Sequence, residues 1–164
     1  MVKVEEIAEK YKDYEVDEEE LKEILVQPKP KTVWDLKEGY RYWWIDTKGI
    51  VHSALWMDCN GVDKEVHILR RAFGNCFLTK EEAEFEVIKR KVETSLLKYG
   101  RREFKPHQDN LCLGYDHDNE EIVECNYICT NKGVIYFDTK ELYQQAINAA
   151  GEDNIKKYIF GVKD

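Results

Sequence analysis

The chain has 164 residues, 43% of them hydrophobic, which suits one packed domain and excludes a disordered chain. Its 33 acidic and 25 basic side chains give a formal net charge of -8 at neutral pH, which argues against a sequence-independent nucleic-acid coat. No stretch approaches the roughly 20 apolar residues of a membrane span, and residues 1–6 lack the apolar core of a signal peptide. We therefore expect a cytoplasmic protein without a membrane partner.

Residues 1–32 are predicted to form an acidic helical appendage, because acidic side chains outnumber basic ones in this stretch. Asp17 and Glu20 have the spacing of a reciprocal helix cap, and a short apolar stripe follows them. Two prolines on either side of Lys29 then favour an extended linker.

Residues 33–105 are predicted to form the first of two related repeats, each a β-meander followed by a helix. Aromatic, β-prone residues at 40–45 indicate the first strand, a glycine turn precedes the second at 50–57, and residues 65–69 indicate the third. Thr79 then opens a helix as the first residue of a capping box.

The helix after Thr79 carries apolar residues at spacings of three and four, which predict one buried stripe. These residues are Phe85, Ile88, Val92, Leu96 and Tyr99. Gly100 is expected to end the helix.

Residues 106–164 are predicted to form the second repeat, with strands at 111–115, 122–129 and 134–137 and a helix capped by Thr139. The strand-to-helix junctions of the two repeats match closely: Phe77-Leu78-Thr79-Lys80-Glu81 and Phe137-Asp138-Thr139-Lys140-Glu141. We therefore predict an α+β fold in which two pseudo-repeated units of antiparallel β-meander plus helix follow the N-terminal acidic helical segment.

Several motifs of the chain recur together in one class of proteins: Gly39-Tyr40-Arg41-Tyr42, Asp46-Thr47-Lys48-Gly49-Ile50, and Gly74-Asn75-Cys76-Phe77-Leu78-Thr79-Lys80-Glu81-Glu82-Ala83-Glu84. With the tail from Tyr136 to Gly151, they resemble a module of small uncharacterised proteins of phages and prophages of Gram-positive bacteria. The resemblance covers Lys37 to Phe160, and Tyr143 departs from it because the module commonly has alanine there.

The resemblance implies an accessory interaction protein in the bacterial host cytoplasm and not a metabolic enzyme. Some phage proteins of this kind act against host systems, including CRISPR nucleases, so it implies a host protein as partner, or a nucleoprotein complex. No P-loop, dinucleotide fingerprint, HExxH motif or nucleophile pattern accompanies it. We therefore expect a non-enzymatic protein that inhibits a defence nuclease.

Three groups of side chains are predicted to contact the partner. Alternate residues of a strand face opposite sides, so the dense aromatic run at 40–45 presents either two covered faces or one exposed binding patch. The arginines before Gly74 either hold an anion or pair with helix carboxylates, and the acidic ends of the chain mimic nucleic acid. The predicted contact residues are Arg41, Trp43, Arg70, Arg71, Glu18, Glu19, Glu20, Asp116 and Asp118.

Two alternatives stay open at this point. The first is a small-ligand protein that binds a nucleotide with the aromatic face, Arg70 and Arg71. The second is direct nucleic-acid contact through the basic tract Lys89–Lys105. Against this alternative, ion pairs such as that of Glu86 with Arg90 would use much of the positive charge of the tract within a solvated helix face.

We expect neither a metal nor a cofactor. The five cysteines are odd in number and form no CxxC pair, which favours reduced thiols used as small apolar side chains. Cys125 and Cys129 are predicted to share one strand face, roughly 13 Å apart and too far for one zinc ion. The acidic turn at 116–121 lacks the glycine of an EF-hand loop.

Overall fold

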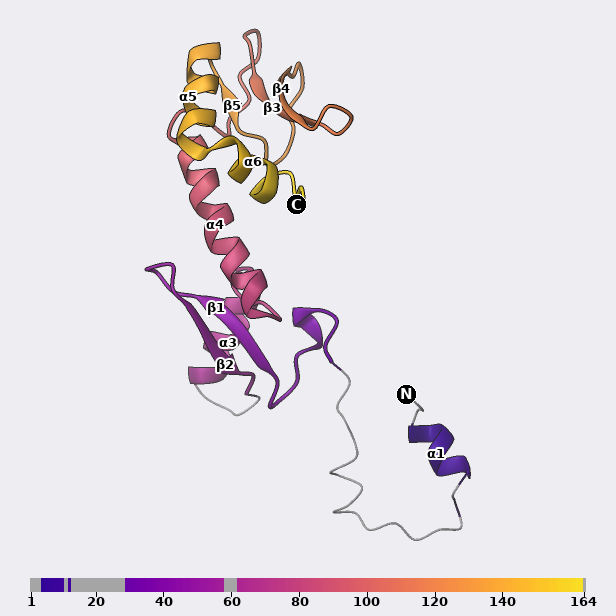
Figure 1. Ribbon diagram of the computed structural model, residues 1–164. Coiled ribbons are helices and arrows are strands. Elements are labelled where there is room, and N and C mark those ends of the chain that lie inside the picture. Colours follow the sequence, from indigo (N-terminus) through magenta and orange to yellow (C-terminus); the bar gives the residue numbers. More distant parts are fainter. Residues whose placement is uncertain (1–3, 11, 13–28, 58–61, 164) are drawn as a thin grey trace. The chain divides into compact units, whose positions relative to one another are not determined.

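The computed structural model describes residues 4–10, 12, 29–57 and 62–163 (Figure 1). Its contacts divide the chain into two compact units, Met1–Lys31 and Thr32–Asp164. The first unit contains the helix α1, Val4–Lys10, with acidic residues in its first turn and Lys10 in its last, which suits the helix dipole. The predicted helix start from Asp17 to Glu20 lies outside the described residues.

The unit Thr32–Asp164 combines helices with two small antiparallel sheets, which confirms the predicted α+β class. Its elements in chain order are η1 Val33–Asp35, β1 Arg41–Ile45, β2 Val51–Leu55, α3 Val62–Ala72, α4 Lys80–Leu97, β3 Leu111–Asp116, β4 Glu121–Asn126, β5 Tyr136–Phe137, α5 Lys140–Ala150 and α6 Glu152–Tyr158.

The strand order differs from the predicted meanders. The second sheet has the order β4-β3-β5, so the last strand pairs with β3 and not with its sequence neighbour β4. In the first sheet β1 pairs with β2, and Phe77 forms an isolated bridge to Trp43 on β1. In each sheet, therefore, the later segment returns beside the first strand of the hairpin.

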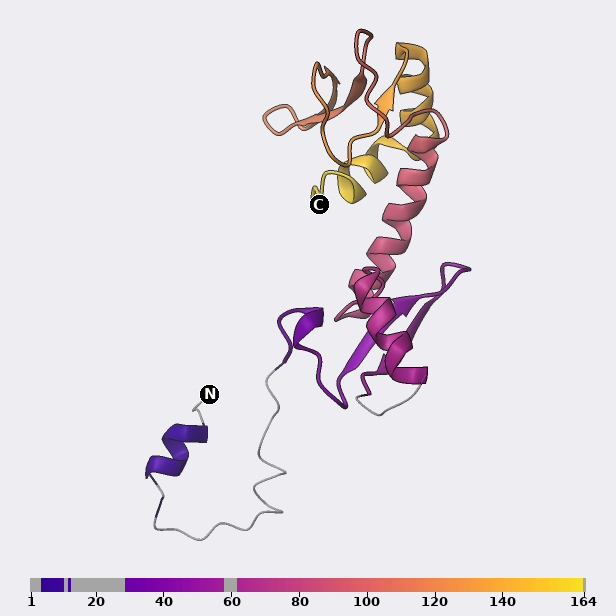
Figure 2. The same cartoon turned by 180° about the vertical axis from the view of Figure 1, so that it is seen from behind.

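The strand predicted at 65–69 is wrong, because these residues lie within α3 (Figure 2). His67 is buried, Val66 and Arg70 are partly buried, and Ile68 and Leu69 are exposed, which is a helical period and not the alternation of a strand. The corresponding stretch of the second half, residues 127–135, contains no helix. The internal repeat is therefore not confirmed.

Both predicted helix caps form at the strand-to-helix junctions. The Thr79 hydroxyl accepts a hydrogen bond from the Glu82 backbone N–H at 3.1 Å, and the Glu82 carboxylate accepts from the Thr79 N–H at 3.3 Å. Thr139 caps α5 in the same way by accepting from the Leu142 N–H at 3.2 Å.

The single buried stripe predicted along α4 is only partly correct. Val92 and Leu96 are buried, but Phe85 and Ile88 are exposed. The reason is that α4 packs on β1 and β2 as well as on α5 and α6, so its inward face changes along its length (Figure 1). Gly100 lies beyond the helix end at Leu97, and it is needed because an added Cβ would come within 2.5 Å of Ile135 Cγ2.

Two groups of buried side chains form the core of this unit. The larger one joins α4 to the second sheet and to α5 and α6; it contains Val92, Leu96, Leu111, Phe137, Tyr143, Ala146, Ala150 and Ile155. The smaller one lies around the first hairpin; it contains Leu36, Tyr42, Trp56 and Cys76. Tyr143, the departure from the family module, is one of the buried side chains.

We expect Thr79→Ala to lower the free energy of unfolding by about 1 kcal/mol, because the first turn of α4 loses its side-chain acceptor. The measurement is urea denaturation. Thr79→Ser keeps the hydroxyl and serves as the control. An alanine variant as stable as the serine variant would show that the cap does not stabilise α4.

Candidate partner-binding surface

The predicted arginine and aromatic residues do come together, in stacked arrangements around the first hairpin. The Arg70 guanidinium carbon lies 3.5 Å from the centroid of the Trp44 ring. The Trp44 ring stacks on His52 at 4.8 Å between centroids, and His52 Nε2 lies 3.0 Å from the Asp46 carboxylate. Arg70 therefore binds an aromatic face and not a helix carboxylate.

Arg71 is held between two indole rings. Its guanidinium carbon lies 4.7 Å from the Trp34 centroid and 4.4 Å from the Trp56 centroid. Trp56 is buried, whereas Trp34 is 67% exposed. The arginine thus fixes an exposed indole on the surface beside the end of α3.

A buried polar chain fastens α3 to the hairpin. Arg70 Nη1 donates to the Tyr42 hydroxyl at 2.9 Å, and that hydroxyl shares a second hydrogen bond with His67 Nδ1 at 2.6 Å. Burial raises the pKa of Tyr42, with the Arg70 hydrogen bond acting in the opposite direction, so the hydroxyl keeps its proton at neutral pH.

The outward side of α3 and its C-terminal end expose large apolar side chains. Phe73 is 81% exposed, and its N–H donates to the Leu69 carbonyl, so these two residues follow each other along the helix surface. We call the exposed apolar residues of α3 and its neighbouring indole the α3 patch; its members are Trp34, Ile68, Leu69 and Phe73. The sequence reasoning missed this patch, and a helical interpretation of residues 62–72 would have found it.

Trp43 and Arg41 point away from the Tyr42 side of β1, as strand alternation requires. Trp43 is partly buried and exchanges backbone hydrogen bonds with Phe77, both at 2.9 Å. Arg41 is exposed, and its Nη1 donates to the Ser53 hydroxyl at 3.3 Å. Neither residue joins the α3 patch.

The acidic residues predicted as contacts fall in different parts of the chain. Asp116 is engaged in the β3–β4 turn, where its carboxylate accepts from the backbone N–H groups of Asp118 and Asn119. Hydrogen bonds, first from the Asn119 side chain, hold its pKa below the usual range. The Asp118 residue is exposed. Glu18, Glu19 and Glu20 lie outside the described residues.

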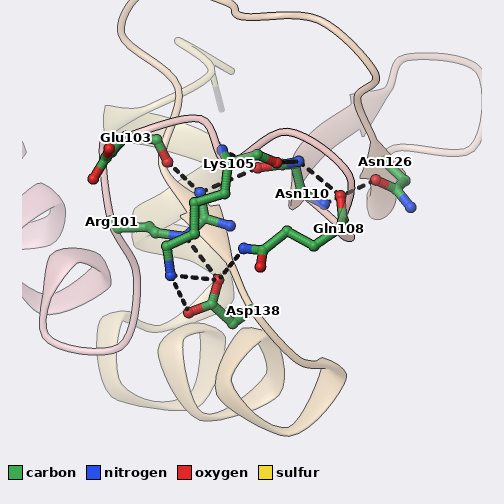
Figure 3. Close-up of polar contacts among 7 residues, drawn as sticks. All are labelled: Arg101, Glu103, Lys105, Gln108, Asn110, Asn126 and Asp138. Atoms are coloured by element: carbon green, nitrogen blue, oxygen red, sulfur yellow. Dashed lines mark hydrogen bonds and ion pairs between the residues drawn. The ribbon is translucent and has the colours of Figure 1, made fainter.

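The densest polar cluster holds the loop between α4 and β3 (Figure 3). Asn110 is only 1% exposed. Its amide oxygen accepts from the Lys105 N–H and from Arg101 Nη1, and its amide nitrogen donates to the carbonyls of Lys105 and Gln108. Because every polar atom of this amide has a partner in the protein, Asn110 holds the loop through protein contacts alone.

Asp138 closes the same cluster from the start of α5. Its carboxylate accepts from Arg101 Nε at 2.7 Å and from Lys105 Nζ at 3.2 Å (Figure 3). These bonds, that of Arg101 first, hold the pKa of Asp138 below its usual value.

The described cysteines are free thiols, and the strand face predicted to be shared by Cys125 and Cys129 is wrong. Cys129 lies outside β4, so it does not share a strand face with Cys125; the residue opposite Cys125 is Cys112. Burial raises the pKa of Cys76 to about 11 and that of Cys112 to about 12, so neither is a thiolate at neutral pH. Cys59 is not among the described residues.

Across residues 4–10, 12, 29–57 and 62–163, no three His, Cys, Asp or Glu residues are grouped so that they could hold a metal ion. In the same part of the chain, every helix is too short or too polar to cross a membrane.

Comparison with protein-family models, with curated proteins and with solved structures found no match to the chain. The resemblance to phage proteins therefore stays a prediction from the motifs.

We expect Asn110→Ala to lower the free energy of unfolding by about 1–3 kcal/mol, because the part-buried backbone groups of Lys105 and Gln108 lose their partner. Asn148→Ala, which removes an exposed amide on α5 bonded only to Gln144, is the control. Chemical denaturation measures both variants. Equal stability of the two would contradict the role assigned to the buried amide.

Acid should weaken the contribution of the Asp138 carboxylate to the stability of the fold. Its folded-state pKa is depressed, so the carboxylate stabilises the fold above its unfolded-state pKa, and this stabilisation is lost as the pH falls through the folded-state value. Asp138→Asn should lower stability at pH 7 by no more than about 1 kcal/mol, since the group is partly exposed, and by less at pH 2. Asp118→Asn is the control. A loss of stability in Asp138→Asn that is the same at pH 7 and pH 2 would refute the stabilising role of the ionised carboxylate.

Proposed function

We propose that the chain is a non-enzymatic protein that binds a macromolecule of a bacterial host through the α3 patch. The observation that carries the proposal is the exposure of Ile68 and Leu69 on α3, of Phe73 directly after its end, and of the Trp34 indole. Single exposed apolar residues are ordinary, whereas a group of them rimmed by charge is typical of a contact surface. Trp and Phe are also among the side chains enriched where protein partners meet.

The way in which Trp34 is held supports the proposal. Its ring lies on the Arg71 guanidinium, whose other neighbour is the buried ring of Trp56. An anchor fixed before binding loses less conformational entropy when the partner arrives. The stack therefore gives a structural reason for an exposed indole at this position.

The finer parts of the proposal rest on the motifs and the charge. We propose a phage or prophage accessory protein that acts in the host cytoplasm and inhibits a defence nuclease such as a CRISPR effector. Residues 1–32 and 106–164 both carry more acidic than basic side chains, whereas residues 33–105 are slightly basic. In sequence, the acidic segments precede and follow the segment that carries the patch, and their charge is complementary to the basic nucleic-acid channel of such an enzyme.

The alternative, a protein that holds a nucleotide on the aromatic and arginine face, has less support. The guanidinium groups of Arg70 and Arg71 already lie on ring faces of Trp44 and Trp56. A base would have to displace them before it could stack there.

The double change Leu69→Ser with Phe73→Ser should abolish inhibition while the fold is kept, because both side chains are exposed. The measurement is plating of a targeted phage on bacteria that carry an active CRISPR system and express the protein. Ile128→Ser removes an equally apolar side chain, 96% exposed in the second half of the chain, and should leave inhibition unchanged.

Two outcomes would reject parts of this proposal. Full inhibition by the double variant, shown to be folded, would remove the α3 patch as the contact surface. Absence of inhibition by the unaltered protein, together with failure to capture any host protein in stoichiometric amount, would reject the inhibitor itself. Replacing Glu18, Glu19 and Glu20 by lysine tests the acidic mimicry separately, and retained inhibition would reject that mechanism.

A further inference from the structure

A second surface feature lies between the β1–β2 turn and the middle of α4. It is a cavity of about 430 Å³, within the range of roughly 300–1,000 Å³ that small-molecule sites occupy. Its lining residues are Ile45, Asp46, Thr47, Gly49, Val87, Arg90, Lys91, Thr94 and Ser95. None of them belongs to the α3 patch.

The α4 side of the cavity is cationic. Arg90 contacts Glu86 through Nε at 2.9 Å, which leaves its two terminal nitrogens for another acceptor. The next residue, Lys91, is exposed and has no ion-pair partner within the described residues. Two adjacent cations with unused donors form an acceptor-binding wall.

The carboxylate in the lining is hydrogen-bonded within its own turn. Asp46 Oδ1 accepts from the backbone N–H groups of Lys48 at 2.9 Å and Ile50 at 2.8 Å. Its Oδ2 lies 3.0 Å from His52 Nε2. These hydrogen bonds, that of His52 first, hold the pKa of Asp46 below its usual value. The carboxylate is therefore ionised at neutral pH, and both of its oxygens are engaged by the turn and by His52.

Two further polar groups of the lining are hydroxyls whose protons are already donated. Thr94 Oγ1 donates to the Arg90 carbonyl at 2.7 Å, and Ser95 Oγ donates to the Lys91 carbonyl at 3.0 Å. The two oxygens can therefore accept hydrogen bonds from hydroxyl groups of a ligand. Val87 adds an apolar wall.

We infer that this cavity binds a small hydroxylated phosphate monoester, with the phosphate on Arg90 and Lys91 and the ligand hydroxyls on Thr94 and Ser95. A small anion fits better than nucleic acid for two reasons. The site is a local hollow lined by nine residues of the hairpin and α4, and the net charge of -8 repels a polyanion more strongly than it repels one phosphate.

The test uses ribose 5-phosphate as the probe and ribose as the uncharged control, in an NMR titration of the full chain. We expect amide shifts confined to the β1–β2 turn and residues 87–95, with ribose producing none. Lys91→Ala should weaken binding about tenfold, the effect of one charge-assisted hydrogen bond. Lys89→Ala removes the same charge from the same helix outside the cavity and should leave the affinity nearly unchanged.

Several results would overturn the inference: no shifts with ribose 5-phosphate, equal shifts with ribose, or equal losses from Lys91→Ala and Lys89→Ala, which would show attraction by charge alone. A single-stranded oligonucleotide that binds more tightly and with the same dependence on Lys91 would assign the cavity to nucleic acid instead. Inhibition of a host nuclease does not depend on this cavity, so the two proposals fail independently.

Discussion

The change from strand to helix at Phe77–Thr79 is the constraint on which the compact unit depends. Phe77 is fixed beside β1 by its paired backbone hydrogen bonds with Trp43. Two residues later the Thr79 side chain ends the extended chain by capping α4. The direction in which α4 leaves the first sheet is therefore set within three residues, and α4 carries Val92 and Leu96 to the larger core.

Covering both sides of a two-stranded sheet explains how the first hairpin uses its aromatic residues. An isolated hairpin is marginally stable in water, so it needs packing on its faces. On one side Tyr42 and Trp44 contact His67 and Arg70 of α3, and on the other side α4 packs against β1. The two arginines of α3 pack on indole rings of this side, and Ile68 and Leu69 lie on the outer side of the helix.

The inward arginines and outward apolar residues of α3 show what the sequence could and could not predict. The threonine caps could be predicted, because capping depends on residues only three positions apart. The helix α3 could not be predicted in this way. Its polar residues His67, Arg70 and Arg71 face inward, and its apolar residues Ile68 and Leu69 face outward. The usual amphipathic helix has its apolar residues on the inner face. The strand order was also hidden, because pairing of β5 with β3 depends on contacts between distant segments and not on the turns.

The α3 patch and the phosphate cavity depend on the same hairpin. A continuous series of contacts runs from Asp46 through His52, Trp44 and Arg70 to the Tyr42 hydroxyl. Spatial continuity alone is not energetic coupling. It does indicate which substitutions can alter one surface without altering the other. Replacing a buried member such as Tyr42 disturbs both, whereas Phe73 and Lys91 each touch one surface and leave the series intact.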